Sequence, residues 1–272
     1  MNPFVIPVIF GTFIFFLLGI WLAKKAKPNF QKVFLSLVAT LAAIPSLLFV
    51  IYYTGIFGEA MWFYSFRAIP GTEFSACGMG LLAGWLQAFR NRTPRLNKRV
   101  SAGFIPFIAT LCVTIPYLKG ILLRPDWNKF EDEWSGNVCL QSSESSCGPA
   151  SAATVLKFFG MTVSEKQIAQ EAFTSRRGTE NWYLIRAIRR HGLVANYALH
   201  KVGDTDFSFP SIIGVRLGDE SGSGHFITVL GKEGGDFLIG DPLGGLHVFS
   251  EAQVTNHYYL TGFCIVVTTN QP

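Results

Sequence analysis

The stretch Gln141-Ser-Ser-Glu-Ser-Ser-Cys-Gly-Pro-Ala-Ser-Ala-Ala-Thr-Val-Leu-Lys-Phe-Phe-Gly160 contains a cysteine at a predicted helix start. Residues 142–146 are polar and turn-prone, and proline at the first helical position followed by small and apolar residues is typical of a helix N-terminus. A thiol at this position lies near unpaired N–H groups and the positive end of the helix dipole, which favour the thiolate. The stretch therefore predicts a nucleophilic Cys147, with an amphipathic helix and an incidental cysteine as the alternative.

A predicted β-hairpin downstream supplies the base that a catalytic cysteine needs. His225 begins a β-rich run, a turn-like Lys-Glu-Gly-Gly follows at 232–235, and a second run ends at Asp241. If the turn centres near Glu233, position 227 faces 239 and His225 falls opposite Asp241. A slip of one residue would place the two side chains on opposite faces. By this count Asp241 orients His225, whereas either residue alone is typical of an ordinary strand end or turn.

The other histidines are weaker candidates for the base. His191 precedes a glycine that ends a predicted helix. No Asp-Pro returns on a following strand beside any of the four remaining histidines, His191, His200, His247 and His257. We therefore rank His225 above them.

The remaining cysteines do not suggest a metal site. Cys77, Cys112 and Cys264 lie in apolar segments, where a cysteine usually acts as a small buried side chain. Cys139 is a candidate to pair with Cys147 in a disulfide if the domain faces an oxidising compartment. No metal-binding spacing occurs among the five cysteines, so we expect no metal or other cofactor.

Four positions in this region resemble the bacteriocin-processing peptidases, which are papain-like cysteine peptidase domains that cut leader peptides after a double-glycine motif and are usually fused to ABC exporters. The matching features are Gln141 six residues before Cys147-Gly-Pro-Ala, Gly-His-Phe-Ile-Thr-Val-Leu-Gly around His225, and Gly-Asp-Pro-Leu-Gly-Gly around Asp241. The resemblance covers roughly residues 134–268. It implies that Cys147 is the nucleophile, His225 the general base and acid, Asp241 the group that orients His225, and Gln141 the side-chain amide donor of the oxyanion hole. One such donor contributes about 3 to 4 kcal/mol in comparable sites.

The composition indicates a membrane protein whose two halves differ. The 272 residues are 49% hydrophobic and 15% charged. Residues 1–122 contain 11 Lys and Arg against 2 acidic residues, whereas residues 123–272 contain 12 against 16. The net charge of +5 therefore comes from the first half, and it argues for membrane loops and against nucleic-acid binding.

Apolar runs in the first half predict about four membrane spans, of which the third is the shortest and is rich in glycine. They are Phe4–Ala23, Val33–Tyr53, Phe74–Phe89 and Ala102–Leu122. Lysines follow the first run, which is the reverse of the order in a cleaved signal peptide, so we expect a retained span. The small-xxx-small spacing of Gly80 and Gly84 indicates close helix packing, within the bundle or, as a weaker alternative, between copies.

Positively charged loops predict the sidedness. Residues 24–32 contain four lysines and residues 90–99 five Lys and Arg, whereas the loop between the second and third spans contains only Arg67. Such loops stay in the cytoplasm, so the peptidase domain should lie outside it, on a multi-pass protein of a bacterial inner membrane. Here the sequence departs from the family pattern, in which the peptidase precedes the membrane segment and is cytoplasmic. The sequence also contains no Walker A motif, so no ATPase is expected.

The expected fold is a transmembrane helical domain over residues 1–122, a linker at 123–133 and an α+β papain-like cysteine peptidase domain over 134–272. Helices are predicted at 164–172 and 179–191. The predicted strands, at 194–200, 212–217, 225–230, 236–240, 246–249 and 262–268, would form an antiparallel sheet against the Cys147 helix.

The expected function is that of a membrane-anchored cysteine endopeptidase that cleaves a leader or secreted peptide after a Gly-Gly-like motif. Its expected partners are a peptide or protein substrate, membrane lipid and a separate exporter. One alternative is a non-catalytic module that binds such a peptide for a transporter, against which the intact Cys147 argues. The other is a different acyl transfer on the same residues, of the transglutaminase or amidase type.

Overall fold

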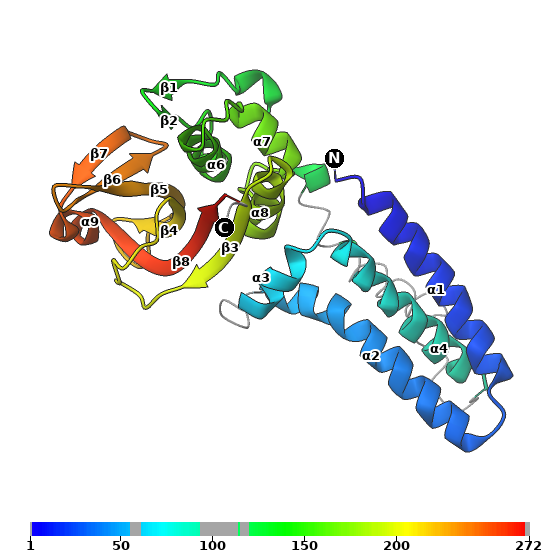
Figure 1. Ribbon diagram of the computed structural model, residues 1–272. Coiled ribbons are helices and arrows are strands. Elements are labelled where there is room, and N and C mark those ends of the chain that lie inside the picture. The colour runs from blue at the N-terminus through cyan, green and yellow to red at the C-terminus, as the bar shows by residue number, and fades with distance from the viewer. Residues whose placement is uncertain (1, 55–60, 93–113, 115–119, 270–272) are drawn as a thin grey trace. The chain divides into compact units, whose positions relative to one another are not determined.

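The computed structural model describes residues 2–54, 61–92, 114 and 120–269 (Figure 1). The chain forms two compact units. One contains Met1–Ala60 and Pro70–Leu122, and the other contains Met61–Ile69 and Leu123–Pro272. The second unit therefore takes in a short segment that lies, in the sequence, between two parts of the first.

The first unit consists, in its described part, of α1 (Val5–Lys25), α2 (Asn29–Thr54), the 3-10 helix η1 (Thr72–Cys77) and α4 (Gly78–Arg92). Within the described residues, α1 and the Asn29–Phe49 part of α2 are long and apolar enough to cross a membrane. The prediction of about four spans is not supported there. The third run divides into η1 and an α4 of 15 residues, which alone is shorter than the ~20 residues of a span. The fourth, 102–122, falls outside the described residues apart from positions 114 and 120–122.

Glycines on α4 allow it to pack directly against the backbones of α1 and α2. A Cβ atom at Gly80 would lie 2.1 Å from the carbonyl oxygen of Thr12, and one at Gly84 would lie 2.0 Å from that of Phe16. Any larger side chain at these positions would force the helices apart. The glycine spacing therefore serves packing within the bundle, as predicted.

The second unit is built around a six-stranded antiparallel sheet with the strand order β3-β8-β4-β5-β6-β7. The strands are β3 (Val194–Leu199), β4 (Ser211–Leu217), β5 (Gly224–Glu233), β6 (Asp236–Asp241), β7 (Gly245–Phe249) and β8 (Tyr258–Thr268). A separate two-stranded ribbon is formed by β1 (Trp134–Ser135) and β2 (Val138–Cys139), after the short 3-10 helix η2 (Trp127–Lys129). Together with its helices, this sheet confirms the predicted α+β class.

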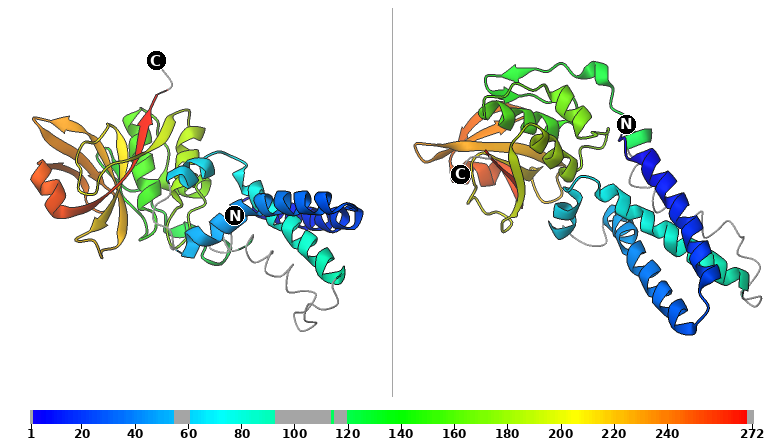
Figure 2. Two further views of the ribbon diagram at one scale, coloured as in Figure 1. Left: turned by 90° about the horizontal axis from the view of Figure 1, so that it is seen from below. Right: turned by 45° about the vertical axis from the view of Figure 1, so that its right-hand side comes forward.

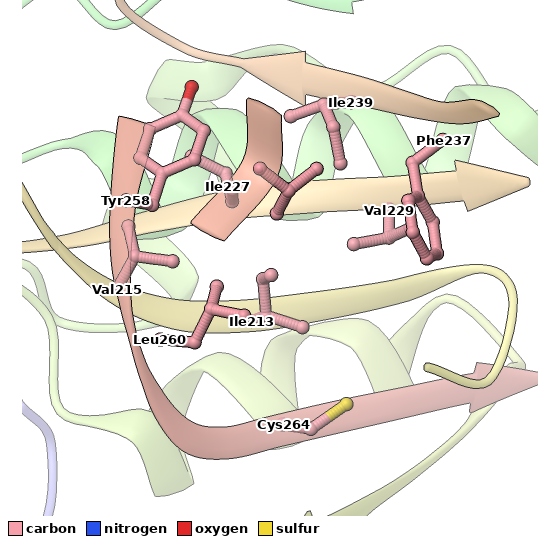
Figure 3. Close-up of a cluster of buried hydrophobic side chains, with 10 residues drawn as sticks. Ile213, Val215, Ile227, Val229, Phe237, Ile239, Tyr258, Leu260 and Cys264 are labelled. Carbon is pink, nitrogen blue, oxygen red and sulfur yellow. The ribbon is translucent and has the colours of Figure 1, made fainter. Parts of the chain in front are cut away.

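Helices cover both faces of the sheet. On one side lie α6 (Cys147–Phe158), α7 (Glu165–Glu171) and α8 (Asn181–Arg190), and on the other lies α9 (Glu251–His257) (Figures 1 and 2). Alternation along the strands explains this. Gly240 faces Thr154 of α6, whereas Ile227 and Ile239 join Val254 of α9 in a buried apolar cluster (Figure 3).

Helix α9 was absent from the sequence-based prediction. Its start is fixed by a capping box, in which the Ser250 side chain accepts from the backbone N–H of Gln253 and the Gln253 side chain accepts from the backbone N–H of Ser250. This Ser-x-x-Gln pattern was a readable signal for a helix start. Strand β8 also begins at Tyr258, earlier than the predicted 262.

The turn between β5 and β6 lies later than the predicted centre at Glu233. Gly234 and Gly235 form it, with φ angles of 61° and 99°, so Glu233 pairs with Asp236. Positive φ at two successive residues is the geometry of a tight hairpin turn and is readily adopted by glycine. The predicted register, with position 227 opposite 239, is therefore wrong.

A β-bulge at Leu230 corrects the consequence of this shift. Leu230 is an extra residue between two consecutive ladder pairs, so Val229 rather than residue 227 lies opposite Ile239. The offset from the predicted register is two residues, and an even offset keeps every side chain on its face. His225 and Asp241 are therefore not directly opposed, as predicted, but they do share a face.

Candidate active site

Cys147 is the first residue of helix α6 and is partly exposed. Pro149 is the third helical residue and not the first, as the sequence had indicated. The third position is equally suited to proline, because the first four N–H groups of a helix have no partner within it. These unpaired N–H donors and the positive end of the helix dipole lie at the N-terminal end of α6, where Cys147 is.

The loop before Cys147 is held by serine hydrogen bonds. The Ser146 hydroxyl donates to the carbonyl of Ser143 at 2.9 Å and accepts from its backbone N–H at 3.0 Å. Ser142 donates to the carboxylate of Glu165 through both its backbone N–H and its hydroxyl. Glu165 is fully buried, and this burial raises the pKa of its carboxyl group. The loop that presents the thiol is therefore fixed to the start of α7.

His225 and Asp241 form a buried pair. His225 Nε2 lies 2.8 Å from Asp241 Oδ1, and each residue is about 5% exposed. The other carboxylate oxygen, Oδ2, accepts a hydrogen bond of 2.6 Å from the hydroxyl of Tyr258, and the backbone N–H of Leu243 donates to Oδ1. Asp241 is thus held by three donors, and Nδ1 of His225 remains for the Cys147 side chain.

His225 and Asp241 each stabilise the charged form of the other. Burial disfavours a charged imidazole, but hydrogen bonds to Asp241 and Cys147 outweigh that effect and raise the pKa of His225 to about 9. Burial likewise opposes ionisation of Asp241, yet hydrogen bonds from His225, Tyr258 and Leu243 lower its pKa to about 2. At neutral pH the arrangement therefore favours an imidazolium between a carboxylate and the cysteine.

Helix α6 is tied to the histidine strand one turn after Cys147. The hydroxyl of Ser151, fully buried, donates to the carbonyl of Phe226 at 3.0 Å. Phe226 follows His225 directly, and its ring lies within 3.5 Å of where a Cβ on Gly148 would stand. This contact fixes the distance between the thiol and the imidazole.

Gln141 lies at the base of the cysteine loop. Its backbone N–H donates to the carbonyl of Pro242 at 2.9 Å, which connects it to the residue after Asp241. Its side-chain Nε2 donates to the carbonyl of Ser143 at 2.8 Å. A primary amide has two N–H donors, so one remains for a substrate oxygen.

The structure brings Cys147, His225 and Asp241 together and ties Gln141 to the loops on either side of them. Tyr258 and Ser151 were not identified from the sequence. A buried tyrosine hydroxyl needs a polar partner, and this rule is the only available signal for Tyr258.

The competing residues lie elsewhere. His191 bonds Glu171 at 3.0 Å, while His247 and His257 contact the ring of Phe249. His200 precedes a turn after β3 and, like these three, contacts none of the site residues through a described hydrogen bond.

The candidate disulfide between Cys139 and Cys147 is not formed in the structure. Cys139 and Cys147 are both free thiols. Cys139 is buried on β2, where desolvation and the nearby carboxylates of Glu165 and Asp132 raise its pKa. It therefore stays in the unreactive thiol form.

The second unit is similar to known proteins. A model described as the Peptidase C39 family matches residues 135–271. An uncharacterised protein of Methanothermobacter marburgensis is 35% identical over 108 residues, which are 40% of this chain and 72% of that protein. A second, from Methanothermobacter thermautotrophicus, is 32% identical over 105 residues, 39% of this chain and 70% of its own length.

Solved structures with similar parts include two peptidase domains. One is the peptidase domain of Streptococcus ComA, a bi-functional ABC transporter involved in quorum sensing, at 22% identity with a TM-score of 0.41, covering 48% of this chain and 96% of that one. The other is a double glycine motif protease from an AMS/PCAT transporter in complex with the leader peptide, at 25% identity with a TM-score of 0.42, covering 49% and 91%.

Proposed function

Because this chain belongs to the peptidase C39 family and is a cysteine peptidase, we propose that it is a membrane-anchored endopeptidase that cleaves a leader or secreted peptide after a small-residue, Gly-Gly-like motif. The observation that carries the proposal is the linked set of Cys147 at a helix start and His225 bonded to Asp241. Small residues before the cut fit a nucleophile that is only partly exposed.

The reaction follows from the arrangement. The Cys147 sulfur attacks the scissile carbonyl carbon, and the oxyanion that forms accepts a hydrogen bond from the Gln141 amide. His225 then gives its proton to the leaving amine as the C–N bond breaks, which leaves a thioester on Cys147. Water, deprotonated by His225, attacks the thioester and releases the new carboxyl end with the thiolate restored. Asp241 holds the imidazole in the required orientation throughout.

A cleavage assay tests this assignment. The full chain in detergent is incubated with a panel of peptides that carry Gly-Gly, Gly-Ala or bulky residues before the cut. Cys147→Ala should abolish cleavage with the fold intact, whereas His191→Ala, which removes an unrelated histidine, should leave it unchanged. Turnover by the purified Cys147→Ala protein would refute the catalytic role of Cys147. Cleavage of the bulky peptides at the same rate as the Gly-Gly peptide would refute the proposed motif.

The membrane part rests on the apolar helices of the first unit. Large apolar side chains of α1 and α2 face outward, including Phe10 at 64% and Leu37 at 57% exposure, which suits lipid contact. Two spans are available in the described residues. We extend this to four, because η1 and α4 together span about 34 Å at about 2.0 and 1.5 Å per residue, close to the ~30 Å of a bilayer core. The fourth is the apolar run at 102–122.

The sidedness follows from nine Lys and Arg in the loops 24–32 and 90–99. With both loops in the cytoplasm, the peptidase domain lies outside it and acts on peptides during or after export by a separate exporter. A fusion after Pro272 tests this. Alkaline phosphatase should be active there and a fluorescent protein that folds only in the cytoplasm should be dark. A bright, phosphatase-negative fusion would reverse the orientation without affecting the catalytic assignment.

A further inference from the structure

The segment Met61–Ile69 belongs to the peptidase unit, although in the sequence it lies between α2 and η1. It forms the short helix α3 (Met61–Arg67) and packs on α8 and β3. The family match begins only at residue 135, so this segment lies outside the matched region.

Two arginines of α8 bind the end of α3. Arg186, which is 4% exposed, donates through Nη2 to the carbonyls of Arg67 at 2.5 Å and Ile69 at 2.6 Å. Arg189 donates through Nη1 to the carbonyl of Ala68 at 3.3 Å. The last carbonyls of a helix lack partners within it and form the negative end of its dipole, so cations suit this position.

Aromatic packing fixes the other side of α3. Phe63 is 3% exposed and meets the ring of Trp182 edge-on at 6.0 Å between centroids. Tyr64 contacts the rings of Tyr197 at 5.8 Å and Phe263 at 6.2 Å. The segment therefore packs into the core of the peptidase unit, against aromatic residues of α8, β3 and β8.

We propose that Met61–Ile69 is a second anchor of the peptidase domain. The domain is then joined to the membrane segment at two points of the chain, before residue 70 and after residue 122, and it lies on the side of the membrane where α2 ends. This inference rests on the membrane insertion of α2 proposed above, but not on catalysis. Because Met61–Ile69 and Leu123–Pro272 fold as one unit, they lie on the same side of the membrane. The chain from Pro70 to Leu122 therefore crosses the membrane an even number of times. Packing of α4 against α1 through Gly80 and Gly84, and against α2 through Gly78, favours two crossings over none.

The double anchor restricts the substrate. A domain tethered at two points of the chain samples fewer positions away from the bilayer than a domain tethered by one linker. The substrates are therefore peptides presented at this membrane surface, either anchored in it or emerging from it.

Adjacent aromatic residues on α3 provide a matched test of the docking. In the full chain in detergent, Phe63→Ala should speed hydrogen exchange of the α8 amides roughly tenfold and lower the Tm of the peptidase unit by a few degrees. Trp62→Ala should change neither, because Trp62 is 61% exposed. Arg186→Met should likewise speed exchange in residues 61–69, while Arg190→Met, on the exposed face of the same helix, should not. Equal effects within either pair would overturn the anchor.

Thiol labelling tests the shared membrane face. In a Cys147→Ala background, a cysteine is placed at Trp62 on α3 or at the exposed Glu220 of the peptidase domain. A membrane-impermeant maleimide should label both from the same side of intact cells, or both only after permeabilisation. Labelling from opposite sides would overturn the proposal. Because the background is catalytically silent, this result is independent of whether the protein proves to be a peptidase.

Discussion

Nε2 of His225 lies 2.8 Å from Oδ1 of Asp241, and the hydroxyl of Tyr258 donates a hydrogen bond to the second carboxylate oxygen, Oδ2. The imidazole is thereby held through Nε2, and His225 also has a side-chain hydrogen bond to Cys147. The same carboxylate thus serves both to orient the ring and to stabilise its charged form.

Removing the hydroxyl of Tyr258 should loosen Asp241 without opening the core. We expect Tyr258→Phe to lower kcat roughly tenfold with KM little changed, because only the position of the base is affected. The pKa of Asp241 should rise when this donor is lost, so the acid limb of the pH–rate profile should move to higher pH. Tyr259→Phe, at the neighbouring and less buried position, is the control. An unchanged acid limb in Tyr258→Phe would show a purely structural role.

Gln141 should act on the transition state alone. Gln141→Ala should lower kcat by about 10²–10³ and leave KM nearly unchanged, because the oxyanion exists only after attack. Gln141→Glu keeps the size and removes the donors, so it should be as severe. Gln167→Ala, an exposed glutamine on α7, is the control. A rise in KM with kcat intact would place Gln141 in substrate binding instead.

The raised pKa of His225 links stability to pH. Its folded value of about 9 lies above the ordinary 6.5, so the protonated ring contributes stability that is fully present below about pH 6.5 and is lost as the pH rises through about 9. Thermal unfolding of the wild type and of His225→Gln between pH 6 and 9.5 measures this contribution.

The stability advantage of the wild type over His225→Gln should shrink across that range. In an Asp241→Asn background it should already shrink at lower pH, because the hydrogen bond that does most to raise the pKa of His225 is lost. Parallel curves for the two proteins would contradict the assigned shift.

The candidate site residues could be predicted from sequence because each has a reactive or polar side chain next to a recognisable turn or helix start. Cys147 follows a turn and begins a helix, and His225 and Asp241 flank a glycine turn. The exact pairing could not be predicted, because the bulge at Leu230 depends on the ladder that forms across the hairpin. Even so, the fixed alternation of strands preserved the shared face.

Two features depended on tertiary structure. Tyr258, at the start of β8, bonds Asp241 at the end of β6, although β4 and β5 lie between these strands in the sheet. Local periodicity does not determine strand order, so this contact could not be predicted. The docking of α3 on α8 joins residues more than 100 positions apart in the sequence. The membrane spans were predicted less accurately than the peptidase domain, because the third apolar run forms a 3-10 helix followed by a short α-helix.

We propose that His225 activates Cys147 as the nucleophile. A peptide with Gly-Gly before a thiol-reactive electrophile, added to the full chain in detergent, should form an adduct that peptide mapping places on Cys147 and not on the buried Cys139. The labelling rate near pH 7 should fall at least about 10-fold in His225→Ala, because the imidazolium that stabilises the reactive thiolate is lost, and it should be unchanged in His191→Ala. Equal rates in the wild type and His225→Ala would show that Cys147 reacts as an ordinary, partly exposed thiol that His225 does not activate.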